Sequence, residues 1–244
     1  MIMKKFMQFV IAVCQLINLV ACTTKAPITP PATLRIVSES TNIDSGLFSQ
    51  SMCKPPCWQN LTPGLSSAED LDQFVKSLES HGWRELVYRR KQSECLWRRI
   101  VVLDNSRLVD FYLVDEKLTF INQSVTPPEI TLQQVVFQYG SPQYFQSVIS
   151  IGHEVDVYAV EVYYPNLGMA FVISPPSGDL NQILPDMPIR SIQYFPVGDM
   201  KSYLTGKYAC DFGYDIAANM ADDEIAKYVQ EWLGFGEVKV IPRQ

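Results

Sequence analysis

Apolar residues in the first half of the chain change from a helical to an alternating spacing. Four of them recur at the spacing of one helix face: Leu71, Phe74, Val75 and Leu78. Ser66 and Glu69 precede this run as a capping box, so the pattern predicts an amphipathic helix that ends near Gly82. Alternating apolar segments follow at 83–89, 95–103, 107–114 and 117–122. We therefore predict one helix followed by an antiparallel meander.

The same order of patterns returns in the second half. Thr131 lies 65 residues after Ser66 and forms a second capping box with Gln134. The helix that follows is predicted to end at 140–142, where Gly140 and a proline stop it. Its buried face is predicted to contain Leu132, Val135, Val136 and Tyr139. Further strands are predicted at 143–151, 154–164, 169–174 and 189–195.

The end of the chain is predicted to form a third helix. Five residues share one helix face: Ile225, Tyr228, Val229, Trp232 and Leu233. The acidic run 222–224 suits the positive end of such a helix, Gly234 suits its C-terminal end, and a last strand is predicted at 237–241. The fold class we expect is α+β, with two tandem units of one helix followed by an antiparallel β-meander, plus a C-terminal helix.

The first 22 residues resemble the signal peptide and lipobox of bacterial lipoproteins. Lys4 and Lys5 precede a mainly apolar run, 6–20, and Cys22 directly follows Leu-Val-Ala. The resemblance implies that 1–21 is removed and that Cys22 is acylated, which holds the protein extracytoplasmically in the cell membrane. An uncleaved membrane helix is disfavoured because the run is shorter than the ~20 residues that a span needs. An ordinary secretory signal is disfavoured by the position of Cys22.

Behind the signal we expect three further segments. A lipidated tether, 22–52, is rich in Pro, Ser and Thr. The first helix-and-sheet unit is expected at 53–125, and the second unit, with the C-terminal helix, at 126–244.

Net charge argues against nucleic acid as a partner. The chain has 20 basic and 26 acidic residues, a formal net charge of −6. Removal of Lys4 and Lys5 with the signal leaves 18 basic residues and a net charge of −8. Such a protein gains nothing from a phosphate backbone, so we expect no nucleic-acid binding.

Four cysteines remain beyond the signal and Cys22. They are Cys53, Cys57, Cys95 and Cys210, and an even number outside the cytoplasm predicts two disulfides. The two prolines between Cys53 and Cys57 favour an extended path of ~12 Å, and a disulfide needs less than ~7 Å between Cα atoms. Unless this segment turns sharply, we expect both to pair with Cys95 and Cys210.

The histidine and cysteine spacing does not support a metal site. Zinc ligands usually occur as closely spaced cysteine pairs or beside histidines. Neither His81 nor His153 lies at such spacing from a cysteine, so we expect no metal and no cofactor.

Two further resemblances come from short motifs. The string 56–64, Pro-Cys-Trp-Gln-Asn-Leu-Thr-Pro-Gly, and the closing string 232–236, Trp-Leu-Gly-Phe-Gly, resemble the ends of a group of uncharacterised bacterial lipoproteins. A capped helix that ends in Tyr-Gly-Ser-Pro at 139–142 before antiparallel strands is similar to the β-lactamase-inhibitor-like repeat of envelope lipoproteins. The first resemblance implies no particular activity. The second implies protein–protein contact at the envelope.

Candidate catalytic groups are weak. Ser51 and Lys54 have the spacing of a serine–lysine pair, but the following prolines prevent the helical turn that this pair requires. His153 lies in a predicted turn, and Glu154 and Asp156 lie on one strand rather than across a cleft. We therefore predict no catalytic residue.

A basic cluster suggests an anionic partner. Its members are Arg89, Arg90, Lys91, Arg98 and Arg99, on neighbouring predicted strands. They could face lipid headgroups or cell-wall polymer, or they could only keep an exposed hairpin soluble.

The function we expect is that of a non-enzymatic binding or interaction module of the cell envelope. Its partners would be the membrane, through the lipid, and an envelope protein or cell-wall component. The alternatives are a cell-surface hydrolase acting on wall or carbohydrate, which would need a cleft with a desolvated carboxyl group, and a passive structural lipoprotein.

Overall fold

A computed structural model of the chain describes 53–79, 83–89, 95–102, 108–125, 130–151, 156–173, 175, 181–205, 227 and 229–239. Every described residue lies in one compact unit within Thr41–Gln244. The predicted signal peptide and the whole predicted tether, with Cys22, lie outside the described residues, as do Cys210, His81 and His153.

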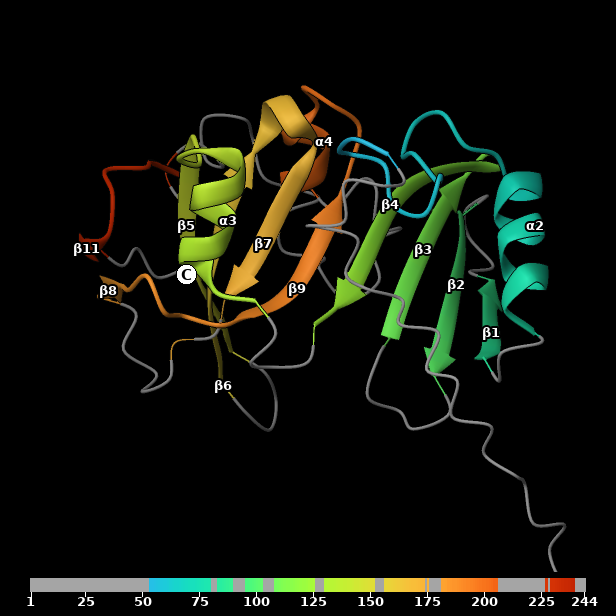
Figure 1. Ribbon diagram of the computed structural model, residues 1–244, viewed down its shortest axis with the longest axis horizontal. Helices are drawn as coiled ribbons and strands as arrows, with labels where there is room; N and C mark the ends of the chain where they lie inside the picture. Colours follow the sequence, from blue (N-terminus) through green and yellow to red (C-terminus); the bar gives the residue numbers. More distant parts are fainter. Residues whose placement is uncertain are drawn as a thin grey trace, which may run out of the picture. The chain divides into compact units, whose positions relative to one another are not determined.

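Nine strands form one antiparallel sheet in the order β1-β2-β3-β4-β9-β7-β6-β5-β10 (Figure 1). Their bounds are β1 Trp83–Arg89, β2 Cys95–Val102, β3 Leu108–Val114, β4 Lys117–Ser124, β5 Tyr144–Ile151, β6 Asp156–Tyr164, β7 Met169–Ile173, β9 Ile189–Tyr194 and β10 Gln230–Glu231. A second, two-stranded sheet pairs β8, Gln182–Ile183, with β11, Gly236–Glu237. Three α-helices are described, α2 Ala68–Glu79, α3 Leu132–Tyr139 and α4 Met200–Leu204, together with a 3-10 turn, η1 Pro165–Leu167.

The α+β class with a large antiparallel sheet is therefore confirmed. The meander β1–β4 and the strands β5, β6, β7 and β9 join edge to edge through the β4–β9 pair, in which Ile121 lies opposite Tyr194. Because this junction is hydrogen-bonded, the two halves of the sheet are continuous rather than stacked.

One face of the sheet packs against α2 and α3. Alternate residues of the strands point to this side, among them Phe111, Val162 and Phe171, and all three are fully buried. Leu71 of α2 and Leu132 of α3 complete the same core. The core also includes Trp58, whose ring lies 5.5 Å from Phe74 and 5.9 Å from Phe111.

The opposite face packs against the short helix α4. Tyr203 of α4 stacks on Phe195 with ring centroids 4.6 Å apart and lies 5.9 Å from Phe120 and 5.8 Å from Tyr163. Its hydroxyl also hydrogen-bonds the side-chain oxygen of Gln193 in β9. Aromatic packing on this side therefore fixes α4 to the middle of the sheet.

The cap of α2 lies one residue later than predicted. The Ser67 hydroxyl accepts from the backbone N–H of Asp70 at 3.2 Å, and the Ser67 N–H donates to the Asp70 carboxylate at 2.7 Å. Ser66 is instead buried, and its hydroxyl accepts from the N–H of Thr62 at 2.9 Å. The predicted pair of Ser66 and Glu69 was wrong because the turn 62–66 already engages Ser66.

The predicted C-terminal helix is wrong over its described end. Gln230 and Glu231 form β10, which pairs with Phe145 and Tyr144 at the edge of β5. Trp232 continues this contact, since its backbone N–H donates to the carbonyl of Gln143 at 3.1 Å and its ring lies 6.3 Å from that of Phe145. Pairing with an open sheet edge and partial burial of the Trp232 ring outweigh the helical period of these residues. The predicted start of the helix, 222–226, lies outside the described residues.

The predicted cysteine pairing is also wrong. Cys53 and Cys57 form a disulfide with each other, with Cα atoms 5.7 Å apart. The N–H of Cys57 donates to the carbonyl of Lys54 at 3.1 Å, so the segment turns sharply. This turn replaces the extended path that the two prolines favour. Cys95 is also disulfide-bonded, and its partner lies outside the described residues.

Candidate functional site

Helix α3 presents the most distinctive surface among the described residues. It begins with the predicted capping box, which is confirmed: Gln134 donates its N–H to the Thr131 hydroxyl, and the Gln134 side chain accepts from the Thr131 N–H at 2.9 Å. Gly140 ends the helix at a positive φ of 79°, and its N–H donates to Val136. Capping residues that can be recognised in the local sequence therefore mark both ends of α3.

The backbone donors of the first turn are already used. The N–H groups of Leu132 and Gln133 donate to the carbonyls of Met187 and Pro185, at 2.9 and 2.8 Å. A helix N-terminus binds an anion through backbone N–H groups that have no other acceptor. Because these two N–H groups already have acceptors, this end of α3 is not an anion site.

The inner face of α3 is anchored in the core. Leu132 and Val135 are fully buried, and Tyr139 makes an edge contact with Tyr164. The Tyr164 hydroxyl donates to the Gly140 carbonyl at 2.8 Å. Burial, followed by the nearby Tyr139 phenol, raises the pKa of Tyr164 well above that of a free tyrosine. This environment holds Tyr164 as a neutral donor and fixes the C-terminal end of α3.

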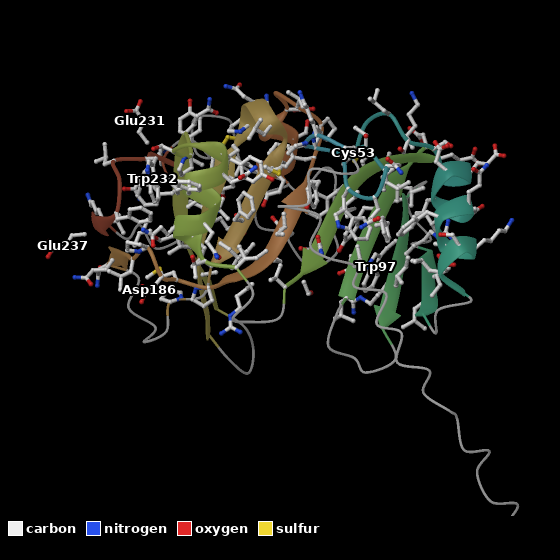
Figure 2. The ribbon with its side chains drawn as sticks, in the orientation of Figure 1. Cys53, Trp97, Asp186, Glu231, Trp232 and Glu237 are labelled. Atoms are coloured by element: carbon white, nitrogen blue, oxygen red, sulfur yellow. A yellow bond between two sulfur atoms is a disulfide. The ribbon has the colours of Figure 1, made fainter. Side chains whose placement is uncertain are left out.

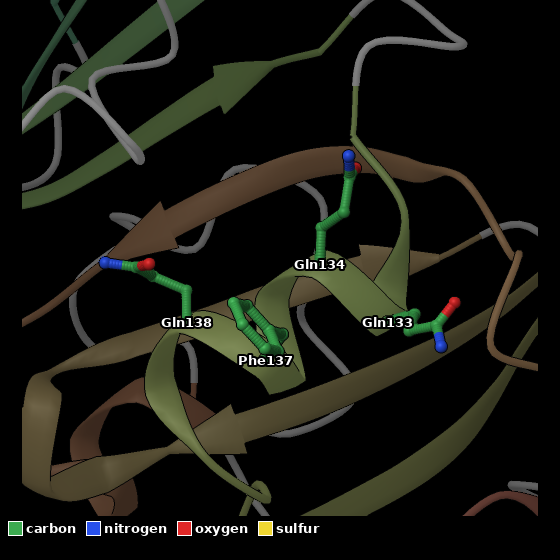
Figure 3. Close-up of a pocket in the computed structure, with 4 residues that line it drawn as sticks. All are labelled: Gln133, Gln134, Phe137 and Gln138. Atoms are coloured by element: carbon green, nitrogen blue, oxygen red, sulfur yellow. The ribbon is translucent and has the colours of Figure 1, made fainter.

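The outer face of α3 contains an exposed aromatic ring among amides. Phe137 is 90% exposed and lines, with Gln133, Gln134 and Gln138, a shallow hollow of about 370 Å³ (Figure 3). The helix, Leu-Gln-Gln-Val-Val-Phe-Gln-Tyr, contains no charged side chain. Surface helices usually show charged residues on their outer face, so this composition is unusual. We call this surface, made of Gln133, Gln134, Phe137 and Gln138, the α3 face.

A closing segment, 232–237, also has exposed apolar side chains. One of its ends is held by the bond from Trp232 to Gln143, just beyond α3, and the other by the pairing of Gly236 with Ile183, close to the start of α3. Figure 2 labels Trp232 to the left of α3 in that view. Within this segment Leu233 and Phe235 are exposed. Exposed apolar side chains therefore occur both on α3 and in the closing segment.

The α3 face contains hydrogen-bonding amides and an aromatic ring. Its four side chains offer amide donors and acceptors and an aromatic ring, but no group that takes up or releases a proton near neutral pH. Acid–base or nucleophilic catalysis requires such a group. Elsewhere in the described segments, no three His, Cys, Asp or Glu side chains are grouped closely enough to hold a metal ion.

Arg98, a member of the predicted basic cluster, is an internal ion-pair residue. It is 6% exposed and pairs with Asp72 of α2 at 2.5 Å and with Glu85 of β1. Burial by itself lowers the pKa of Arg98, but hydrogen bonds and charges from Glu85 and Asp72 outweigh burial and raise it above its ordinary value. Arg98 thus connects three elements within the protein.

Arg99 points to the opposite face of the sheet. Its guanidinium donates to both Asp110 oxygens, at 2.6 and 3.0 Å, and lies 4.7 Å from the centre of the Trp97 ring. Trp97 in turn donates to Asp110 at 3.0 Å and stacks on Tyr112. Adjacent strand residues alternate between faces, so the structure does not bring Arg98 and Arg99 together. Arg89 lies in β1, but its side chain is not among the described parts of the structure. Arg90 and Lys91 lie outside the described residues.

Sequence reasoning missed the α3 face, although its signal was present. The helical spacing that identified Leu132, Val135, Val136 and Tyr139 as buried leaves Phe137 on the other side of the same helix. An aromatic residue opposite the buried stripe of a capped helix could have been recognised as exposed.

Comparisons with known proteins add little. No model of a known protein family matches the chain, and neither does any curated protein. A search of solved structures matches the chain, at 10% identity and a TM-score of 0.33, to the crystal structure of a cysteine-rich secretory protein from Staphylococcus aureus, with 64% of this chain and 51% of that chain covered. The chain therefore spans about half the length of that protein. No helix within the described ranges has the length and hydrophobicity needed to cross a membrane.

Proposed function

We propose that this protein is a lipid-anchored interaction module of the cell envelope that binds a partner protein through the α3 face. The observation that supports this most is Phe137, which lies almost fully exposed on an uncharged helix. Burying a phenylalanine side chain is worth about 1.5–3 kcal/mol, so a partner that covers the ring gains most of that free energy. Buried aromatic anchors of this kind dominate the energy of many interfaces.

The composition of the α3 face indicates the kind of partner. Three glutamine amides around the ring can each donate and accept hydrogen bonds, which matches the exposed backbone groups and polar side chains of another protein. Because α3 has no charge of its own, the interaction should depend little on salt. We therefore propose a protein partner with an apolar socket for Phe137, rather than an anionic polymer or lipid surface.

The lipid anchor places this surface at the membrane. Acylated Cys22 and the Pro-rich tether 22–52 would hold the folded unit outside the cytoplasm, close to other envelope proteins. Tethering raises the effective concentration of the protein for a membrane-bound partner, so a single aromatic anchor can suffice for binding.

We also infer that the folded part consists of two related helix-and-sheet units, 53–125 and 126–244. The support is that α2 precedes the meander β1–β4, that α3 precedes β5, β6 and β7, and that both helices contribute to one core. An interaction module could use the second unit for binding and the first for support. Expression of 53–125 alone, followed by a urea melt, tests this inference; a non-cooperative transition contradicts it.

Site-specific photo-crosslinking in the cells that make the protein tests the proposed function. A benzophenone amino acid at Phe137 should give a discrete adduct with one envelope protein. The same residue at Leu65, which is 81% exposed on a different segment, serves as the matched control. Phe137→Ala should then weaken binding of the purified adduct partner by about tenfold, or ~1.4 kcal/mol. Equal adduct patterns at both positions would contradict the proposal. An adduct with a second copy of this chain would also contradict it, because the α3 face would then mediate self-association rather than bind another protein.

A further inference from the structure

The segment 230–238, near the end of the chain, is fastened to the rest of the fold at two separate places. At one, β10 pairs with two residues of β5, and the backbone N–H of Trp232 donates to the carbonyl of Gln143 at 3.1 Å. At the other, β11 pairs with two residues of β8, and the N–H of Val238 donates to the carbonyl of Asn181 at 2.7 Å. We call 230–238 the strap. Ladders this short hold a segment only weakly, because an isolated pair of strands is marginally stable in water.

The side chains of the strap add modest packing. Trp232 and Val238 pack against the core, and both are only partly buried. The Trp232 ring lies 6.3 Å from that of Phe145 and 5.6 Å from that of Phe235. Leu233 is 90% exposed and Phe235 is 39% exposed. Segments with few buried contacts open locally at a lower free energy than core strands, so the strap should detach while the large sheet stays intact.

The backbone of the attached strap requires glycine on both sides of Phe235. Gly234 has a φ of +106° and Gly236 has a φ of +136°, which residues with a Cβ atom rarely adopt. A Cβ atom at either position would meet nothing within 4 Å. Alanine at Gly234 would therefore strain the attached strap without colliding with any neighbour, and it would favour the detached state.

The strap is connected to the start of α3 through β8. The chain runs from β8 directly into the segment that holds this helix end, where the carbonyls of Pro185 and Met187 accept the N–H groups of Gln133 and Leu132. Detachment of the strap removes β11 from β8 and leaves this segment with fewer restraints. We therefore expect detachment to loosen the first turn of α3, from which Gln133 and Gln134 contribute to the α3 face.

We propose that the strap is a conformational switch for the α3 face: it detaches independently of the large sheet, and its detachment loosens the first turn of α3 and weakens binding there. This inference rests on the proposed function of the α3 face. Coupling between two sites is reciprocal, so a partner on the α3 face also holds the strap in its attached state.

Hydrogen exchange of the full chain at a series of low urea concentrations tests whether the strap opens separately. The strap amides, those of Trp232 and Val238, should exchange through an opening that depends little on urea. The amides of β6 and β7 should exchange through an opening that depends steeply on urea, because it exposes much more surface. The same urea dependence for both groups would overturn the proposal, since the strap would then open only with the whole fold.

Gly234→Ala tests the connection to α3, with Gly198→Ala as the matched control. Gly198 has a φ of +78° and also no neighbour within 4 Å of an added Cβ, but it lies in the turn before α4. Gly234→Ala should remove most of the protection of the strap amides and speed exchange of Leu132 and Gln133 about tenfold relative to β6, whereas Gly198→Ala should do neither. Unchanged exchange of Leu132 and Gln133 in a variant whose strap amides have lost protection would overturn the proposal.

A crosslink that keeps the strap attached should have the opposite effect. Gln182→Cys and Glu237→Cys replace two exposed residues that lie opposite each other in β8 and β11. A disulfide between them should slow exchange of Val238, Leu132 and Gln133 by about tenfold. Misfolding cannot imitate this gain of protection, and its absence in the crosslinked protein would overturn the proposal.

These exchange measurements need no partner, so they are independent of the test of the proposed function. Where a photo-crosslinker at Phe137 gives an adduct in cells, Gly234→Ala should reduce its yield several-fold and Gly198→Ala should not. An undiminished yield in Gly234→Ala would overturn the switch and leave the proposed function intact. Absence of any adduct in the unaltered chain would contradict the proposed function instead, and hydrogen exchange alone would then decide whether the strap controls the start of α3.

Discussion

At the scale of single residues, Arg98 connects more of the structure than any other described ion-pair residue. Its guanidinium lies on the helix-covered face of β2 and reaches both Asp72 and Glu85, on α2 and β1. Charges that are buried and paired stabilise a protein only while both partners remain, because an unpaired charge in such a place is costly. The arginine therefore holds α2 against the edge of the sheet.

Replacing Arg98 should show this role. Arg98→Met keeps most of the apolar volume but leaves Glu85 without its partner. We expect the free energy of unfolding to fall by about 1–3 kcal/mol in a urea melt, less than for a fully buried pair because Asp72 is exposed. Lys76→Met, an exposed change on the same helix, should cost less than about 0.5 kcal/mol. Equal losses in the two variants would contradict the account.

At the scale of elements, the turn at Gly168 shows how distant segments fix one another. Gly168 follows η1 with φ at +62°, and a Cβ atom there would lie 2.2 Å from the carbonyl oxygen of Phe195 and 2.9 Å from a side-chain atom of Pro56. The disulfide loop 53–57, the β6–β7 turn and the end of β9 thus meet at one glycine. No side chain fits at this position without moving backbone.

A pair of glycine substitutions separates backbone strain from steric overlap. Gly168→Ala should lower the free energy of unfolding by about 3 kcal/mol or more, since it adds both a strained φ and a collision. Gly198→Ala has a similar φ, +78°, but a Cβ there meets nothing within 4 Å, so it should cost only about 1–2 kcal/mol. Thermal or urea melts measure both. If Gly168→Ala were no worse than Gly198→Ala, the proposed packing of the three segments would be wrong.

Local patterns predicted most of the elements in this fold. The strands at 83–89 and 108–114, and the capped helix α3, follow from alternation and capping residues that act within a few positions of one another. The conformations of Gln230 and Trp232 depend on distant partners, namely the edge of β5 and the ring of Phe145. The pairing of Cys57 depends on a tight turn that its sequence did not predict. Helical spacing near Trp232 was real, but tertiary contacts decided the outcome. The exposure of the α3 face could have been predicted from helical spacing, and the separation of Arg98 from Arg99 could have been predicted from the alternation of side chains in a strand. The ion-pair partners of the two arginines could not, because they lie on other elements.

At the scale of the whole molecule, the disulfides of the folded part bear on the proposed location outside the cytoplasm. Cys95 is buried and disulfide-bonded, with a partner beyond the described residues. If Cys14 is removed with the signal and Cys22 carries lipid, Cys210 is the one cysteine left for it. Two disulfides fit an oxidising compartment outside the cytoplasm.

Peptide mapping of the unreduced, mature protein should find Cys95 linked to Cys210 and Cys53 linked to Cys57. The N-terminal peptide of the same digest should begin at Cys22 and have the added mass of its acyl chains. A bond between Cys95 and Cys22 would contradict lipidation of that thiol directly, and with it the proposed anchoring at the membrane.

The most direct measurement for the central claim is hydroxyl-radical footprinting of Phe137 in two settings. The purified protein in detergent and the protein in its native membrane are oxidised side by side, and modification of Phe137 is compared with that of Leu65 by mass spectrometry. A partner that covers the α3 face should reduce oxidation of Phe137 several-fold in the native membrane, with Leu65 oxidised equally in both. Equal oxidation of Phe137 in the two settings would contradict the account, because the ring would then be as exposed in the cell envelope as in the isolated protein.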